Sequence, residues 1–203
     1  MKARLAVAGL PDAGAHGAAV VLVRHGETAD NDAGRFQGWT DTPLNERGHT
    51  QAAELAATSR PGGGYRHLVG SDLVRAAATA DALGRRLGLA QAVDERLRES
   101  DRGRWEGLRL SDVQRDEPDA WADWRAAGSG FRFPGGESLA EHQQRARAAV
   151  GDILAGPLPA VAVCHGGTIR CLLADDLERF HDLEVPNCSM FGLDQAGRPV
   201  GLA

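Results

Sequence analysis

The stretch "AAVVLVRHGETADN" (18–31) decides how this chain is expected to fold. Residues 18–24 form a continuous apolar run ending in charge, which is typical of a strand buried on both faces of a parallel sheet. Arg24, His25, a glycine and an acid stand where the run ends. In open parallel sheets, ligands bind beyond the carboxyl ends of the strands. These polar residues are therefore the first candidates for a functional site.

Apolar runs and helix-forming segments alternate along the rest of the chain. This alternation predicts an α/β domain with a mostly parallel central sheet. A helix with Ser138 as N-cap and Glu141 three residues later has the pattern of a capping box. The expected helices cover 45–59, 73–88, 138–154 and 168–177, and the further expected strands lie within 66–72, 90–97, 159–167 and 188–194.

Length and composition describe an ordinary folded protein. The 203 residues are 42% hydrophobic and 25% charged, with a net charge of −5. This negative balance argues against nucleic acid or an anionic membrane as a partner, but it does not exclude a small anionic substrate. The chain also lacks an apolar run of the roughly 20 residues that a membrane span needs. The oligomeric state stays open, a homodimer included.

Cysteine usage favours a cytoplasmic location. The three cysteines at 164, 171 and 188 are odd in number and none forms a CxxC pair. A disulfide framework is therefore not expected, and a reducing compartment is favoured. The apolar stretch "LAVAGL" (5–10) is shorter than the core of a secretory signal, which runs to about 7–15 residues.

The chain is expected to hold one domain. We assign residues 1–17 to an N-terminal arm, disordered or only partly ordered, and residues 18–203 to a single domain. Residues 100–137 are irregular and rich in Trp, Gly and Arg. We expect them to form an inserted segment that covers the sheet edge as a lid and determines substrate specificity.

Three strand exits carry the polar side chains that point to a function. The first is Arg24-His25, the second is Ser71-Asp72 followed by Arg75, and the third begins at His165. If the strands are parallel, their carboxyl ends meet at one edge of the sheet. Two histidines and two arginines would then share one pocket.

This set of side chains suits a phosphoryl group. Two guanidinium groups neutralise a dianion and hold its oxygens through forked hydrogen bonds. The backbone N–H groups where helices begin add further donors. A neutral imidazole is a competent nucleophile near neutral pH, and a second imidazole can donate to the charge that grows on the transferred group.

A metal site is the main competing use for histidines and acids. Zinc usually needs three or four ligands close together. No HxxxH pattern or cluster of such residues appears in the sequence, so we expect neither a metal nor another cofactor. The remaining histidines are scattered through arm, helix and loop segments: His16, His49, His67, His142 and His181.

Five blocks in order resemble the histidine phosphatase superfamily, also called the phosphoglycerate mutase-like family. The most specific is "VLVRHGETADNDAGRFQGWTDTPLNERGHTQA" (21–52). The later blocks are "SDLVRAAATA" (71–80), "LRESDRGRWEGL" (97–108), "PGGES" (134–138) and "VAVCHGGTIR" (161–170). The resemblance covers roughly residues 19–194 and implies a three-layer α/β/α fold.

The resemblance implies a role for each matched residue. His25 would be the nucleophile that becomes phosphorylated, and Glu99 would protonate the leaving oxygen and then take a proton from water. One carboxyl group serving both steps follows from microscopic reversibility. The rest of the phosphate pocket would comprise Arg24, Arg75 and His165, with substrate contacts at Asn31, Gln37, Gly38 and Gly166.

The resemblance favours hydrolysis over isomerisation. Glycolytic mutases have a longer basic insertion in this region and a tyrosine where this chain has Arg102, whereas the segment between Glu99 and Glu137 is compact here. We therefore expect a phosphomonoester hydrolase acting on a phosphorylated small molecule. A phosphoglycerate mutase is the alternative, and a phosphate-binding module without catalysis is a further one.

We expect residues 100–137 to determine which substrate the protein binds. The pair Trp121 and Trp124, three residues apart, either packs a short helix onto the sheet or roofs the pocket. Arg132 is a candidate for binding a carboxylate or a second phosphate. The other candidates are Arg102, Arg104, Phe131 and Phe133.

Overall fold

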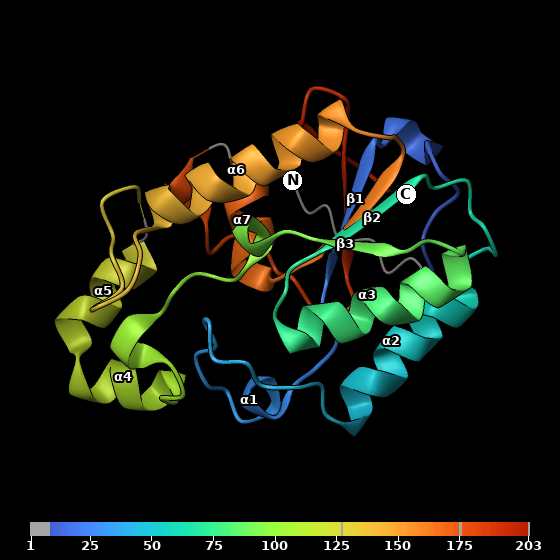
Figure 1. Ribbon diagram of the computed structural model, residues 1–203. Helices are drawn as coiled ribbons and strands as arrows, with labels where there is room; N and C mark the ends of the chain where they lie inside the picture. The colour runs from blue at the N-terminus through green and yellow to red at the C-terminus, as the bar shows by residue number, and fades with distance from the viewer. Residues whose placement is uncertain (1–8, 127, 175, 203) are drawn as a thin grey trace.

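A six-stranded sheet runs through the middle of the molecule (Figure 1). The computed structural model describes residues 9–126, 128–174 and 176–202. The strand order is β3-β2-β4-β1-β5-β6, and the first four of these strands are parallel to their neighbours while β5 and β6 are antiparallel. The mostly parallel sheet is confirmed. The strands are β1 (Val20–Arg24), β2 (His67–Gly70), β3 (Gln91–Val93), β4 (Ala160–Cys164), β5 (Met190–Leu193) and β6 (Pro199–Val200).

Helices cover both faces of the sheet, giving the three expected layers (Figure 1). One face packs against α2 (Glu46–Thr58) and α3 (Val74–Leu87), and the other against α6 (Leu139–Ala155) and α7 (Gly166–Leu173). Side chains of β1 alternate between the two cores because successive residues of a strand point to opposite faces. This two-sided burial explains the unbroken apolar run in the sequence.

Local signals set the ends of two helices as expected. The Ser138 side chain accepts a hydrogen bond from Glu141 N, and the Glu141 side chain returns one to Ser138 N, so the capping box of α6 is present. Gly88 ends α3 in the left-handed conformation at φ 70°, which favours glycine.

Residues 100–137 are more regular than we expected. They contain α4 (Leu110–Asp116) and α5 (Pro118–Ala126), which lie together beyond one end of α6 (Figure 1). Such short helices gain little from helix propensity, and an aromatic cluster stabilises them instead. Its buried members are Phe36, Trp105, Val113, Trp124, Phe133, Leu139, Cys171, Leu177 and Phe180. The segment also contains the 3-10 turn Gly103–Trp105, and the short elements elsewhere are α1 (Ala29–Asp32) and the 3-10 turns Ala15–Gly17, Glu95–Leu97 and Leu177–Arg179.

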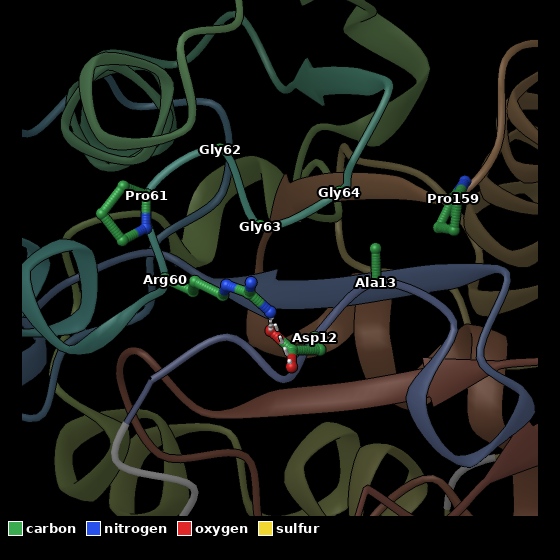
Figure 2. A pocket seen from close by; sticks show the side chains of 8 residues that line it. All are labelled: Asp12, Ala13, Arg60, Pro61, Gly62, Gly63, Gly64 and Pro159. Atoms are coloured by element: carbon green, nitrogen blue, oxygen red, sulfur yellow. Dashed lines mark hydrogen bonds and ion pairs between the residues drawn. The ribbon is translucent and has the colours of Figure 1, made fainter.

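The described part of the N-terminal arm packs on the domain. Leu10 is buried, its N–H donates to Ser59 Oγ at 3.0 Å, and Ala13 N donates to the Gly63 carbonyl at 3.0 Å. Residues 1–8 of the expected arm lie outside the described residues. An open cavity of about 390 Å³ lies between the arm, the 60–64 loop and Pro159. Figure 2 shows the side chains that line it. The cavity lies at the amino ends of β2 and β4, away from the edge where the strands lead to the histidines.

Among the described helices, none has the length and apolar character needed to cross a membrane.

Candidate active site

The register between β1 and β4 brings two histidines into contact. Arg24 pairs with Cys164 in the parallel ladder, so the residues that follow, His25 and His165, leave the sheet side by side. Their ring centroids are 5.1 Å apart, and both side chains are buried. Two strand exits far apart in the sequence therefore form one site.

His25 is oriented by its own backbone neighbour. Nδ1 lies 2.7 Å from the Gly26 carbonyl, and a carbonyl can only accept, so Nδ1 carries the proton and Nε2 keeps its lone pair. Burial, reinforced by Arg24 and Arg75, lowers the pKa of His25 well below its usual range. The imidazole is therefore neutral and suited to nucleophilic attack.

His165 presents two polar atoms without protein partners. Neither ring nitrogen has a hydrogen-bond partner among the described residues, although the side chain is fully buried. Burial, followed by the charge of Arg75, lowers the pKa of His165 well below its usual range. Leaving a buried polar group unpaired costs about 1–3 kcal/mol, and such groups cluster at functional sites. A bound oxyanion would supply the missing partner.

Two arginines are held beside the histidines by backbone carbonyl groups. Arg24 Nη1 donates to Val185 O at 2.5 Å, and fully buried Arg75 donates to Thr40 O at 2.9 Å and to Gly38 O at 2.8 Å. Loss of solvation, followed by the charge of Arg170, lowers the pKa of Arg24 to about 10. Concentrated positive charge in a poorly solvated site attracts an anion such as a phosphate group.

Glu99 lies at the start of α7 and next to a third arginine. Its carboxylate accepts from Ser100 N and Gly167 N, both at 2.8 Å, and Arg102 Nη2 is 3.4 Å from Oε1. Burial acts to raise the pKa of Glu99, but Arg102, His142 and the two backbone N–H groups outweigh it and lower the pKa to about 2. The carboxyl group is therefore ionised in the unliganded protein.

The expected substrate-contact residues surround this centre. Asn31 Oδ1 accepts from Asn187 Nδ2 at 3.1 Å, and the same Asn187 amide donates to the His25 carbonyl at 3.1 Å. Gln37 donates to Asp30 at 3.2 Å, and Asn31 Nδ2 is 3.5 Å from Gln37 Oε1. These amides form one network that reaches the backbone of His25.

The two expected glycines pack against charged groups of the site. A Cβ on Gly38 would collide with the Glu106 carboxylate, and Gly38 O itself binds Arg75. A Cβ on Gly166 would come within 3.4 Å of Arg24 Nε. The structure thus brings together Arg24, His25, Arg75, Glu99 and His165, with Asn31, Gln37, Gly38 and Gly166 around them.

The specificity candidates divide into two groups. Arg102 faces the site: it is ion-paired with Glu99 and stacks over Phe133, 4.4 Å from the ring centroid. Arg132 instead binds Glu141 and the Gly136 carbonyl, and Arg104 binds Glu117. Trp121, Trp124, Phe131 and Phe133 pack in or against the aromatic cluster that supports Arg102.

Several supporting residues were not identified from the sequence. Glu106 accepts from Trp39 N at 2.7 Å and Thr40 N at 2.8 Å and so fixes the loop that binds Arg75. His142, which we counted among the scattered histidines, is fully buried, and its ring binds Ser100 Oγ at 2.6 Å. Its place on the apolar face of α6 is the signal that would have separated it from the exposed histidines.

The described part of the chain shows no cluster of possible metal ligands. No group of three or more His, Cys, Asp and Glu side chains is gathered there as a metal ion would need. Metal independence stays a prediction.

Comparisons with known proteins place this geometry in a family. The family model described as "Histidine phosphatase superfamily (branch 1)" matches residues 20–199. Glucosyl-3-phosphoglycerate phosphatase of Mycobacterium tuberculosis is 39% identical over 168 residues, covering 76% of this chain and 73% of that protein. The probable phosphoglycerate mutase GpmB of Yersinia pestis is 38% identical over 188 residues, covering 89% of this chain and 86% of that protein.

A solved structure agrees with these sequence matches. The mycobacterial glucosyl-3-phosphoglycerate phosphatase in complex with VO3 superimposes with a TM-score of 0.75 at 36% identity, covering 87% of this chain and 91% of that one. The family model spans nearly the whole domain, from β1 to β6, and both relatives match over most of their length. The chain is an enzyme of the histidine phosphatase superfamily.

Proposed function

We propose that the protein hydrolyses phosphomonoesters through a phosphohistidine formed on His25. The observation that carries this proposal is the buried His25–His165 pair, in which the Gly26 carbonyl holds His25 Nδ1 and leaves Nε2 as the nucleophile. Arg24 and Arg75 supply the charge that a phosphate dianion needs. The substrate is a phosphorylated small molecule.

In the first half-reaction, His25 Nε2 attacks phosphorus and the ester P–O bond breaks. His165 donates a hydrogen bond to the transferred group, and Glu99 gives its proton to the leaving alcohol oxygen. Glu99 is ionised before substrate binds. A phosphate anion paired with Arg24 and Arg75 cancels positive potential around Glu99, so the carboxyl group takes up a proton as substrate binds.

In the second half-reaction, water attacks the phosphohistidine. Glu99, now a carboxylate, takes the proton from the attacking water, and the P–N bond to His25 breaks to release inorganic phosphate. Glu99 is then protonated, as it was at the start of the first half-reaction, and it loses this proton when phosphate leaves the site. No metal or cofactor takes part in either step.

The tests begin with the nucleophile. We expect His25→Asn to abolish turnover of p-nitrophenyl phosphate and labelling of the protein by 32P-substrate, whereas exposed His49→Gln retains both. Acid-labile 32P on wild-type His25 supports the proposal. Full activity of His25→Asn would contradict it, as would loss of activity with EDTA that zinc restores.

Hydrolysis and isomerisation are separated by the product of one substrate. With 3-phosphoglycerate we expect free phosphate rather than 2-phosphoglycerate. The compact 100–137 segment supports hydrolysis, and the likeness to a probable mutase is the reason to measure both products. Binding of phosphate without any turnover across a panel of phosphomonoesters would instead favour a non-catalytic module.

The cellular setting belongs to the same proposal. Cys164, Cys171 and Cys188 are free thiols, which suits a reducing cytoplasm. A net charge of −5 disfavours nucleic acid and anionic membranes as partners. A homodimer is expected to be visible by light scattering if it forms.

A further inference from the structure

Glu99 lies on a segment with little secondary structure of its own. The short 3-10 turn Glu95–Leu97 ends just before it, and the backbone at Arg98 is no longer helical. Carbonyl groups in such a segment have no ladder or helix partners, so side chains must supply the hydrogen bonds. The position of the Glu99 carboxylate therefore depends on groups elsewhere in the fold.

Arg145 supplies most of those hydrogen bonds. From α6 its Nη1 donates to the carbonyl groups of Arg96 at 2.8 Å and Arg98 at 2.7 Å, and its Nη2 donates to the carbonyl of Glu99 itself at 2.7 Å. One planar guanidinium thus binds the carbonyl groups of three of four consecutive residues. Thr168 Oγ1 adds a hydrogen bond to the Arg98 carbonyl and Trp39 Nε1 adds one to the Glu99 carbonyl, both at 3.0 Å. A lysine, with its single ammonium group, does not reproduce this fork.

Glu137 holds that guanidinium in place. It accepts from Arg145 Nε at 3.0 Å and Nη2 at 2.5 Å, and its Oε1 also accepts from Asp101 N at 2.9 Å. The side chains of Arg145 and Glu137 are only 19% and 13% exposed. The ion pair therefore anchors the backbone on both sides of Glu99.

The carboxylate of Glu99 is held by a different set of groups. Ser100 N, Gly167 N and Arg102 contact its oxygens, whereas Arg145 binds the backbone carbonyl. Arg145 thus acts on Glu99 through the main chain. General acid catalysis is sensitive to such positioning because proton transfer requires hydrogen-bond distance to the leaving oxygen.

We propose that Arg145, held by Glu137, is a positioning residue that places Glu99 for proton transfer in both half-reactions. The proposal rests on the function proposed above. It assigns Arg145 no contact with substrate. Weakening the fork should impair the steps that need a proton and spare phosphoryl transfer to a leaving group that needs none.

Leaving-group dependence tests this inference. Arg145→Lys and Arg145→Met are assayed for kcat/KM on p-nitrophenyl phosphate, phenyl phosphate and glycerol 3-phosphate. In this order, the leaving oxygen depends more and more on receiving a proton as the ester bond breaks. We expect a loss of roughly tenfold to a hundredfold on glycerol 3-phosphate and less than about threefold on p-nitrophenyl phosphate. We also expect slower decay of the 32P-labelled enzyme, because Glu99 accepts the proton of the attacking water.

Arg147→Met is the matched control, since Arg147 lies on the same helix, is exposed and makes a long hydrogen bond to Ala174 O at 3.5 Å, away from the Glu99 segment. It should leave all three substrates unchanged. Equal losses on the three substrates, or none, in a folded Arg145→Lys protein would overturn the inference. Glu137→Gln provides a second folded variant with the same expected pattern. Absence of wild-type turnover or of 32P-His25 would instead refute the proposed function.

Discussion

Gly167 leaves no room for a side chain beside Glu99: a Cβ at this position would collide with the carboxylate that Gly167 N binds. The second glycine after His165 is therefore a requirement of close approach, since the carboxylate sits on the first turn of α7. This contact joins the third strand exit to the segment that carries the acid.

Gly167→Ala should impair proton transfer by Glu99 although the Glu99 side chain stays in place in the sequence. The methyl group pushes Glu99 away from the α7 backbone, and we expect kcat with glycerol 3-phosphate to fall by about a hundredfold or more. Gly151→Ala is the control, because Gly151 lies exposed in α6 with open space at its Cβ. It should keep full activity and stabilise the fold by about 0.5–1 kcal/mol. Unchanged turnover in Gly167→Ala would contradict the contact.

Replacing Arg102 should change the titration of Glu99. Burial raises the pKa of Glu99, and Arg102 is the largest influence opposing it. In Arg102→Met we expect the acid limb of the kcat profile to move to higher pH, because Glu99 must be ionised to accept a proton from water. The pH profile of Arg104→Met, a change at an exposed arginine paired with Glu117, should match the wild type.

Stability should fall as the solution becomes acidic. Burial, followed by the charge of Arg145, lowers the pKa of His142 to about 3. Between pH 6.5 and that value the unfolded chain binds a proton that the native state does not, so the free energy of unfolding decreases with falling pH. We expect His142→Gln to remove up to about 1.4 kcal/mol per pH unit of this slope in urea unfolding. His49→Gln, at an exposed site, should keep the slope.

The aromatic cluster should control both stability and catalysis. Phe133 is fully buried and lies under the Arg102 guanidinium. Phe133→Ala should cost about 3–5 kcal/mol of unfolding free energy and lower kcat, because Arg102 loses its support beside Glu99. Leu108→Ala, at a position 41% exposed, serves as the comparison and should change the unfolding free energy by less than about 0.5 kcal/mol. A normal kcat in a folded Phe133→Ala protein would show that the aromatic cluster does not support catalysis.

The sequence alone predicted β1 to β5 and the convergence of three strand exits, but it did not predict β6, whose two residues are too few to show a pattern. The run before Arg24 and the run before His165 are both continuous and apolar, which predicted strands of a parallel sheet whose exits share one edge; the direct pairing of β1 with β4 was not predicted. The capping box of α6 could also be predicted, because Ser138 and Glu141 lie only three residues apart. These features depend on neighbours in the chain, which periodicity and turn chemistry describe well.

The directions of the side chains in residues 100–137 could not be predicted from the sequence. Arg132 stands between two phenylalanines in the sequence and Arg102 does not, yet only Arg102 faces Glu99, whereas Arg132 turns to Glu141. The choice depends on how α4 and α5 pack through Trp105 and Trp124, residues whose partners lie far away in the sequence. Arg145 was missed for the same reason, because its acceptors are carbonyl groups that carry no residue signature.

The segment before β5 has a consequence for how the protein matures during synthesis. Val185 O binds Arg24, Asn187 donates to the His25 carbonyl, and Cys188 N donates to the Arg24 carbonyl. His25, the proposed nucleophile, appears early in translation, but these three restraints are synthesised more than 150 residues later. A ribosome-bound chain that ends before Val185 should therefore be catalytically silent, and activity should begin only when this late segment emerges and docks.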